Sequence, residues 1–483
     1  MGTRVDPMLG WISLSSLDAV GRIGLKVLAT VLFARWLTPD IFGQSSLTIV
    51  LVALLAIIVT APFEEALTQR KVVDSRHFRT ALTVVTALSV VICGVVFTVG
   101  LIVDHVAGEQ YPVAATVAWF SVILFAQGPI SIYTALARRQ RAFKRIAMSN
   151  LSGDTIGTAV GLALAWSGVG VWSLLAVRFV SAFVVLSALM AGSPVRFGFG
   201  LSRDRLRDLS SFAGWLFAVR CTDRISDALF QGLVASFFGL NGAGYLNMAL
   251  RIIEPMRGVT GSMGHNIAMS FYVRAQDDPA RLRASVEQTL SSTSLLLLPL
   301  FIGLAASGPT IITLLAGAAW APSGPLVSCL SLAAALTACT NFLQSAIAAR
   351  GRVDLTFAAT ALELGLMVIA LWGLTHWGLL AVGAARLVSN AGEAIFNVAA
   401  AGRVFDLRAR RILRLIGPVA LSAAAMGCVV AAVGSRLAGA FSPGMTLVAQ
   451  ILLGVAMYTV LALLFHRVAL RSVHARLFNR RAA

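Results

Sequence analysis

The chain has 483 residues, of which 58% are hydrophobic and 12% are charged, and its formal net charge is +18. Soluble domains carry about 25% charged residues, so a chain with a mean hydropathy of +0.84 has more apolar surface than one core can bury. The composition therefore predicts an all-α, polytopic membrane protein. It argues against a transmembrane β-barrel, because the apolar runs are continuous and lack the alternation of barrel strands.

The positive charge does not point to nucleic acid. The basic residues form short clusters between apolar runs, as in the cytoplasmic loops of membrane proteins, and no nucleic-acid-binding motif is present. The five cysteines show no CxxC spacing, and the six histidines are scattered. We therefore expect no catalytic residues, no metal and no cofactor. The loops are too short to hold a soluble catalytic domain, so we do not expect an enzyme.

Runs of about 20 mostly apolar residues, long enough to cross a bilayer, recur along the chain and predict about fourteen transmembrane helices. They lie at 11–34, 43–62, 80–103, 113–135, 151–167, 169–190, 212–238, 243–264, 288–314, 324–346, 355–374, 377–399, 413–433 and 444–466. Basic clusters follow the even-numbered spans, which predicts that both termini are cytoplasmic. We expect the first span to be retained, because it carries Arg22 and Lys26 and lacks a clear signal-peptide cleavage site.

The sequence contains an internal repeat. Three pieces recur in the same order about 200 to 210 positions later: ARWLTPDIFGQ (34–44) as ASFFGLNGAGY (235–245), ARRQRAF (137–143) as AARGRVD (348–354), and GVGVWSLLAVRFVS (168–181) as THWGLLAVGAARLVS (375–389). The last match aligns Arg178 with Arg386. Such a repeat predicts two six-helix lobes related by a pseudo-two-fold axis along the membrane normal, with a substrate site between them.

The repeat also predicts the domain boundaries. We expect a first lobe at 1–190 and a second at 191–402, which begins with a cytoplasmic linker at 191–211. Two extra C-terminal helices and a basic cytoplasmic tail occupy 403–483.

The seventh span is unusually charged. Arg220, Asp223, Arg224 and Asp227 fall on one helix face, because residues of an α-helix advance by about 100° each. Four charges at the centre of a span cost about 10–14 kcal/mol on an insertion scale, so this face must contact other helices or a wet cavity. Two interpretations stay open: the Arg–Asp pairs at i,i+3 form a structural strut, or they bind a ligand.

Other spans also carry charged side chains, among them a stripe of Arg386, Asn390, Glu393 and Asn397 on the twelfth span. Surplus cations favour an anionic substrate, because arginine forks bind phosphate and carboxylate groups. Arg251 can instead snorkel to the interface. The substrate-binding candidates are Arg22, Lys26, Arg220, Arg224 and Arg251. The candidates for charge balance or for coupling to protons or sodium ions are Asp223, Asp227, Glu254, Glu363 and Glu393.

Five stretches carry a family resemblance: LFARWLTPDIFGQSSL (32–47), ALTQR (66–70), ARRQRAFKRIAMSN (137–150), GVGVWSLLA (168–176) and GYLNMALRIIEP (244–255). Together they resemble the polysaccharide-repeat-unit flippases of the multidrug/oligosaccharidyl-lipid/polysaccharide exporter superfamily, over roughly 10–400. The span-one arginine of the family resembles Arg22, and Asp227 with Gly232 matches its span-seven pattern. The stretch from Asp227 to Gly244 is longer than in the family.

The resemblance implies a V-shaped, two-lobe bundle that works by alternating access in the bacterial inner membrane. The implied substrate is an undecaprenyl-pyrophosphate-linked oligosaccharide, translocated for exopolysaccharide, capsule or O-antigen synthesis. It also implies membrane lipids, a polysaccharide polymerase and a chain-length regulator as partners. Two alternatives stay open: a cation-coupled exporter of small molecules with the same fold, and a non-transporting membrane component of polysaccharide assembly.

Overall fold

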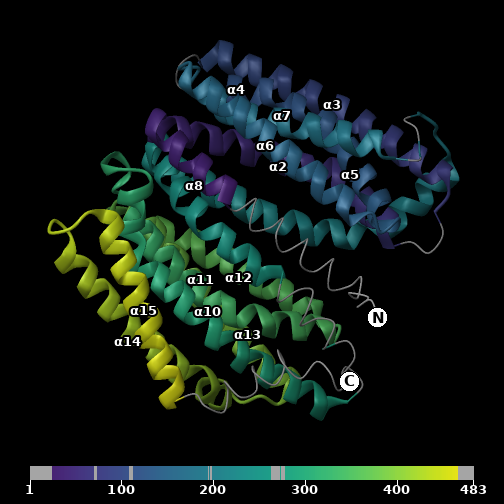
Figure 1. Ribbon diagram of the computed structural model, residues 1–483. Coiled ribbons are helices and arrows are strands. Elements are labelled where there is room, and N and C mark those ends of the chain that lie inside the picture. The colour runs from purple at the N-terminus through teal and green to yellow at the C-terminus, as the bar shows by residue number, and fades with distance from the viewer. Residues whose placement is uncertain are drawn as a thin grey trace, which may run out of the picture. The chain divides into compact units, whose positions relative to one another are not determined.

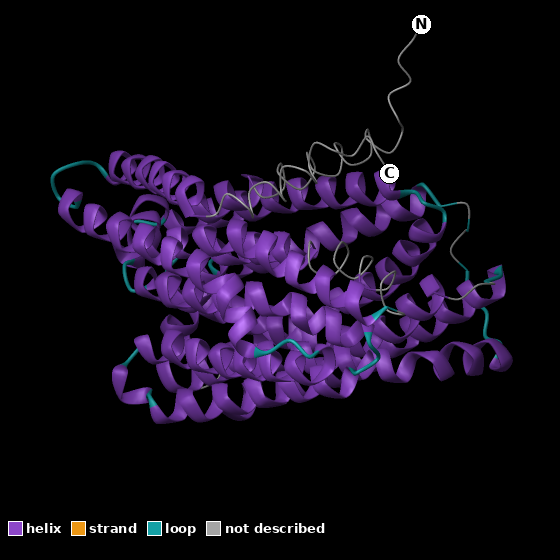
Figure 2. Ribbon diagram, turned by 90° about the horizontal axis from the view of Figure 1, so that it is seen from below, coloured by secondary structure: helices purple, strands orange, loops and turns teal. Residues whose placement is uncertain are grey.

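The structure is a computed structural model that describes residues 24–69, 73–107, 112–193, 195, 198–262, 272 and 278–465. Over 207–223 and 259–262 it describes the backbone alone. Figure 2 shows helices throughout the described chain and no strand among them. The fold divides into two compact units, Met1–Gly244 and Tyr245–Ala483. The lobe boundaries expected from the repeat stay a prediction.

The first unit contains a helical segment at 24–36 and the helices that follow it in Figure 1. These are α2 (Pro39–Gln69), α3 (Ser75–Ala107), α4 (Pro112–Phe120), η2 (Ser121–Ile123), α5 (Leu124–Arg139), α6 (Phe143–Trp166), α7 (Val171–Ala191) and the first part of α8 (Arg203–Ser262). Aliphatic and aromatic side chains of α2, α3, α5 and α7 form its core, including Val85, Tyr133 and Val185. This core fixes the positions of the polar residues on α6 and α7.

The second unit begins in α8, which is interrupted at Gly239, where φ is 69°. Glycine adopts this left-handed conformation without the strain that a β-carbon brings. The later helices are α10 (Pro279–Leu315), η4 (Ala318–Trp320), α11 (Ser323–Ala349), α12 (Val353–Gly373), η5 (Thr375–Trp377), α13 (Leu380–Phe405), α14 (Ala409–Leu437) and α15 (Pro443–Phe465). Helix α11 packs against both α10 and α13, and the α14–α15 hairpin packs on α10 (Figure 1).

Ten helices among the described residues are long and apolar enough to cross a membrane. The chain is therefore a multi-pass membrane protein, as the composition predicted. Helices α6 and α13 coincide with the fifth and twelfth predicted spans but are not among the ten, because charged and polar side chains lower their mean hydropathy. The total of fourteen spans and the pseudo-two-fold axis stay predictions.

The connection between α7 and α8 is fastened to α3 of the same unit. The backbone N–H of Gly200 donates to Thr83 Oγ1 at 2.9 Å, and the N–H of Ser202 donates to Thr80 Oγ1 at 3.3 Å. Arg205 forms an ion pair with Asp74 at 3.1 Å. The predicted linker at 191–211 therefore has contacts with the first unit along its described residues.

Two matched pieces of the repeat meet inside the first unit. A β-carbon added at Gly43 would lie on the carbonyl oxygen of Leu240, and one added at Gly244 would lie on the carbonyl oxygen of Pro39. Gly43 aligns with Gly244 in the repeat, and Pro39 aligns with Leu240. The contact is therefore reciprocal, and it requires glycine on both sides because backbone approaches backbone.

Candidate functional site

A buried ion pair joins α12 and α13 in the second unit. Arg386 Nη1 donates to Glu363 Oε1 at 2.6 Å, and the two side chains are 14% and 9% exposed. Arg386 also lies 3.6 Å from the sulfur of Met367, which is fully buried. Buried charges are found paired because an isolated ion loses its hydration without compensation. The pairing explains how α12 and α13 tolerate these charges.

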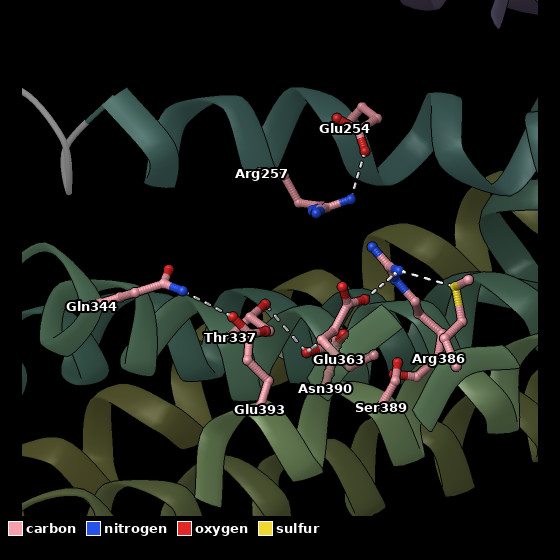
Figure 3. A network of polar contacts seen from close by, with 11 residues as sticks. Glu254, Arg257, Thr337, Gln344, Glu363, Arg386, Ser389, Asn390 and Glu393 are labelled. Atoms are coloured by element: carbon pink, nitrogen blue, oxygen red, sulfur yellow. Dashed lines mark hydrogen bonds and ion pairs between the residues drawn. The ribbon is translucent and has the colours of Figure 1, made fainter. Parts of the chain in front are cut away.

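A second carboxylate belongs to the same polar network, shown in Figure 3. Glu393 is buried on α13 and accepts a hydrogen bond at 3.4 Å from the side-chain amide of Gln344 on α11. Asn390, one turn before Glu393, donates to the carbonyl oxygen of Ala333 at 3.2 Å. The network thus connects three helices of the unit. We call Glu363, Arg386, Asn390, Glu393 and Gln344 the acidic cluster.

Arg257 approaches the acidic cluster from α8. It pairs with Glu254 at 2.8 Å, and Figure 3 shows its side chain pointing from α8 toward Glu363 and Arg386. Arg386 pairs with Glu363 and Arg257 with Glu254, whereas the hydrogen-bond partners of Glu393 are the amide side chains of Gln344 and Asn397. Such a carboxylate can take up and release a proton within a membrane-spanning unit.

A second polar group lies in the first unit, between the 24–36 segment, α6 and α7. Lys26 Nζ lies 4.0 Å from Asp154 Oδ2, and Ser181 Oγ donates to Asp154 Oδ1 at 3.5 Å. Gly157 brings α6 close to α7, since a β-carbon there would lie 2.4 Å from the carbonyl oxygen of Val177. Small residues at a helix interface allow such close approach, and here they place Asp154 beside Ser181.

The remaining sequence candidates fall in several places. Arg22 lies outside the described residues, as do the side chains of Arg220 and Asp223. Arg224 and Asp227 are exposed, and within the described part of the chain no ion pair joins them. Arg251 donates to Asn247 Oδ1 at 2.9 Å. Binding and coupling roles for all ten candidates stay predictions.

The structure brings together some residues that the sequence did not associate. Glu363 and Glu393 were predicted separately and share one cluster, to which α11 adds Gln344. The signal for Arg386 was its place in the stripe on the twelfth span. No comparable signal marked Asp154, whose role depends on helices far away in the sequence. Among the described residues, no group of histidine, cysteine, aspartate and glutamate is arranged to hold a metal ion.

The chain resembles known proteins in sequence and in fold. Residues 32–325 match the family described as "Polysaccharide biosynthesis protein". The succinoglycan biosynthesis transport protein ExoT of Rhizobium meliloti is 28% identical over 69% of this chain and 67% of its own length. The lipopolysaccharide biosynthesis protein WzxC of Escherichia coli is 24% identical over 74% of this chain and 73% of its own length.

A solved structure of the lipid II flippase MurJ, in an inward closed conformation, superposes with a TM-score of 0.75. It covers 94% of this chain and 99% of its own length at 13% sequence identity. This likeness establishes the fold, an all-α helical architecture shared with the lipid II flippase. The predicted fold class is confirmed.

The family match spans more than half of the chain. The chain belongs to the polysaccharide biosynthesis protein family, and the resemblance inferred from its sequence is confirmed.

Proposed function

We propose that this protein flips a lipid-linked oligosaccharide across the bacterial inner membrane during polysaccharide synthesis. The observation that carries the proposal is the similarity to the succinoglycan transport protein, which extends over two thirds of both chains. The fold of the lipid II flippase supports the same reaction type. The proposed task is to move a large polar headgroup while its lipid tail stays in the bilayer.

The headgroup of the proposed substrate is a sugar repeat unit on undecaprenyl pyrophosphate. Its phosphates would be held by cationic side chains of the first unit, the described candidates being Lys26 and Arg224. Arg224 and Lys26 are both exposed, as a binding residue must be. Arginine offers a planar fork of donors to phosphate oxygens, so these contacts can form without any metal ion.

Transport would proceed by alternating access between two lobes, driven by a coupling ion. Glu393 is the favoured coupling residue because Arg386 already balances the other carboxylate, Glu363. A proton is the favoured ion, because a single buried carboxylate can carry one without further ligands. Both termini would lie in the cytoplasm. A polymerase and a chain-length regulator of the same pathway would act beside this protein in the membrane.

Deleting the gene from its own host tests the proposal. Lipid-linked repeat units should accumulate on the cytoplasmic leaflet, and export of the polysaccharide should stop. Expression of the wild-type chain should reverse both effects. Normal export together with no accumulation in the deletion strain would reject the proposed function.

A further inference from the structure

Arg178 lies in the middle of α7, one helical turn before the Ser181 that contacts Asp154. It aligns with Arg386 in the internal repeat, and the backbone supports this alignment. Gly170 precedes α7 with φ 67° and ψ −129°. Gly378 precedes α13 with φ 61° and ψ −144°. The two arginines therefore follow equivalent turns at equivalent positions of their helices.

The face of α7 that carries Arg178 is the packed face. At 3.6 residues per turn, Arg178 falls beside Leu174, Ala182 and Val185, which are all buried. The exposed apolar residues Trp172 and Phe183 fall on the opposite side. Arg178 is nevertheless exposed, so its guanidinium reaches a solvent-accessible space on the side of α7 that faces the other helices of the unit.

The two equivalent arginines differ in their partners. Arg386 forms a 2.6 Å ion pair with Glu363 of the preceding helix. In the first unit, the acid of the preceding helix is Asp154, which has a shorter side chain and contacts Lys26 and Ser181 instead. Among the described residues, no ion pair or hydrogen bond involves Arg178. The arginine charge that Glu363 neutralises in the second unit is therefore available, in the first unit, to bind a ligand.

We propose that Arg178 and Lys26 together form a binding site for a pyrophosphate group in the first unit. This inference rests on the proposed function and deepens it. Among the described side chains, the two cations Arg178 and Lys26 stand against one carboxylate, that of Asp154. The acidic cluster of the second unit instead has two carboxylates, Glu363 and Glu393, and Arg386 forms its ion pair with Glu363. Arg178 and Lys26 would therefore hold the pyrophosphate, while the acidic cluster would bind the coupling cation.

Binding of farnesyl pyrophosphate to the purified full-length protein in detergent tests this site, with farnesol as the uncharged comparison. Arg178→Gln should weaken binding of farnesyl pyrophosphate by about 10-fold to 100-fold, the value of one hydrogen bond to a charged group. Arg178→Lys should recover part of the affinity. Asp154→Asn removes the competing carboxylate and should raise the affinity several-fold.

The matched control is Arg386→Gln, which removes the equivalent arginine of the second unit. It should lower the temperature of thermal unfolding, whereas Arg178→Gln should leave that temperature unchanged. Unchanged pyrophosphate binding by Arg178→Gln would overturn the assignment, and so would a loss of thermal stability equal to that of Arg386→Gln. If Arg178→Gln does not fold, an unchanged affinity in Asp154→Asn overturns it instead. The gene-deletion experiment tests the transport function separately, because its result does not depend on this binding measurement.

Discussion

Gly43 and Gly244 occupy equivalent positions in the internal repeat, and each packs against the backbone of the other's helix. Gly43 faces the carbonyl oxygen of Leu240, and Gly244 faces that of Pro39. Reciprocal contacts of this kind arise when two similar elements meet about a two-fold axis.

Gly43→Ala should open this contact. A β-carbon there would fall on the Leu240 carbonyl oxygen, and overpacking at a close contact costs about 1–3 kcal/mol. We expect a lower temperature of thermal unfolding in detergent and reduced polysaccharide export. The control is Gly94→Ala on α3, where an added β-carbon meets nothing within 4 Å. Equal stability and equal export of the two variants would contradict the tight contact.

Breaking the Glu363–Arg386 pair should destabilise the second unit. Removing one partner of a buried ion pair costs about 3–5 kcal/mol because the other charge stays buried without compensation. Arg386→Gln should therefore lower thermal stability strongly, and the double variant Glu363→Gln with Arg386→Gln should restore much of it. The exposed pair of Arg352 and Asp354, at 2.9 Å, provides the comparison, since surface pairs contribute about 0–1 kcal/mol. A double variant no more stable than Arg386→Gln would refute the pairing.

Glu393→Gln should uncouple transport without unfolding the protein. The amide has the shape of the carboxylate and keeps a hydrogen-bonding group beside Gln344, but it cannot bind a proton. In membrane vesicles, an imposed pH gradient should drive export by the wild type, and the variant should respond at least about 10-fold less, as expected for the loss of an essential proton carrier. Equal responses to the gradient would exclude Glu393 as the coupling residue.

The attachment of the α7–α8 connection to α3 should persist across physiological pH. The pKa of Asp74 is lowered from 3.8 to about 2, first by the hydrogen bond from the His77 backbone N–H and further by the His77 ring and Arg205. A lowered pKa in the folded state gives stability above pH 3.8 that is lost as the pH falls through about 2.

Hydrogen exchange of the Gly200 and Ser202 amides should therefore show no change in protection attributable to Asp74 between pH 5 and pH 8, once intrinsic exchange rates are removed. Asp74→Ala should increase exchange at both amides, whereas Asp40→Ala should not, because Asp40 is exposed at the start of α2, away from this connection. A fall in protection between pH 5 and pH 8 that depends on Asp74 would contradict the assigned pKa.

The sequence predicted the all-helical membrane fold because the apolar runs are long and continuous, and it placed Glu363 and Glu393 among the candidates because charge is rare in such runs. It could not show that Arg386 is paired while none of the described residues pairs with Arg178. That difference depends on which acidic residue the neighbouring helix carries, and on whether the side chain of that residue is long enough to contact the arginine. The Gly43–Gly244 contact could not be predicted from the sequence either. Aligning the two copies of the internal repeat shows that the positions are equivalent, but not that they lie in contact.

The central claim is that this chain moves lipid-linked oligosaccharides between leaflets, and reconstitution tests it most directly. The purified protein would be placed in sealed vesicles that contain an undecaprenyl-pyrophosphate-linked repeat unit from its host, and a membrane-impermeant glycosidase would be added outside. We expect an imposed proton gradient to make nearly all of the substrate accessible to the enzyme within minutes. Accessibility that stays at the level of protein-free vesicles would contradict it.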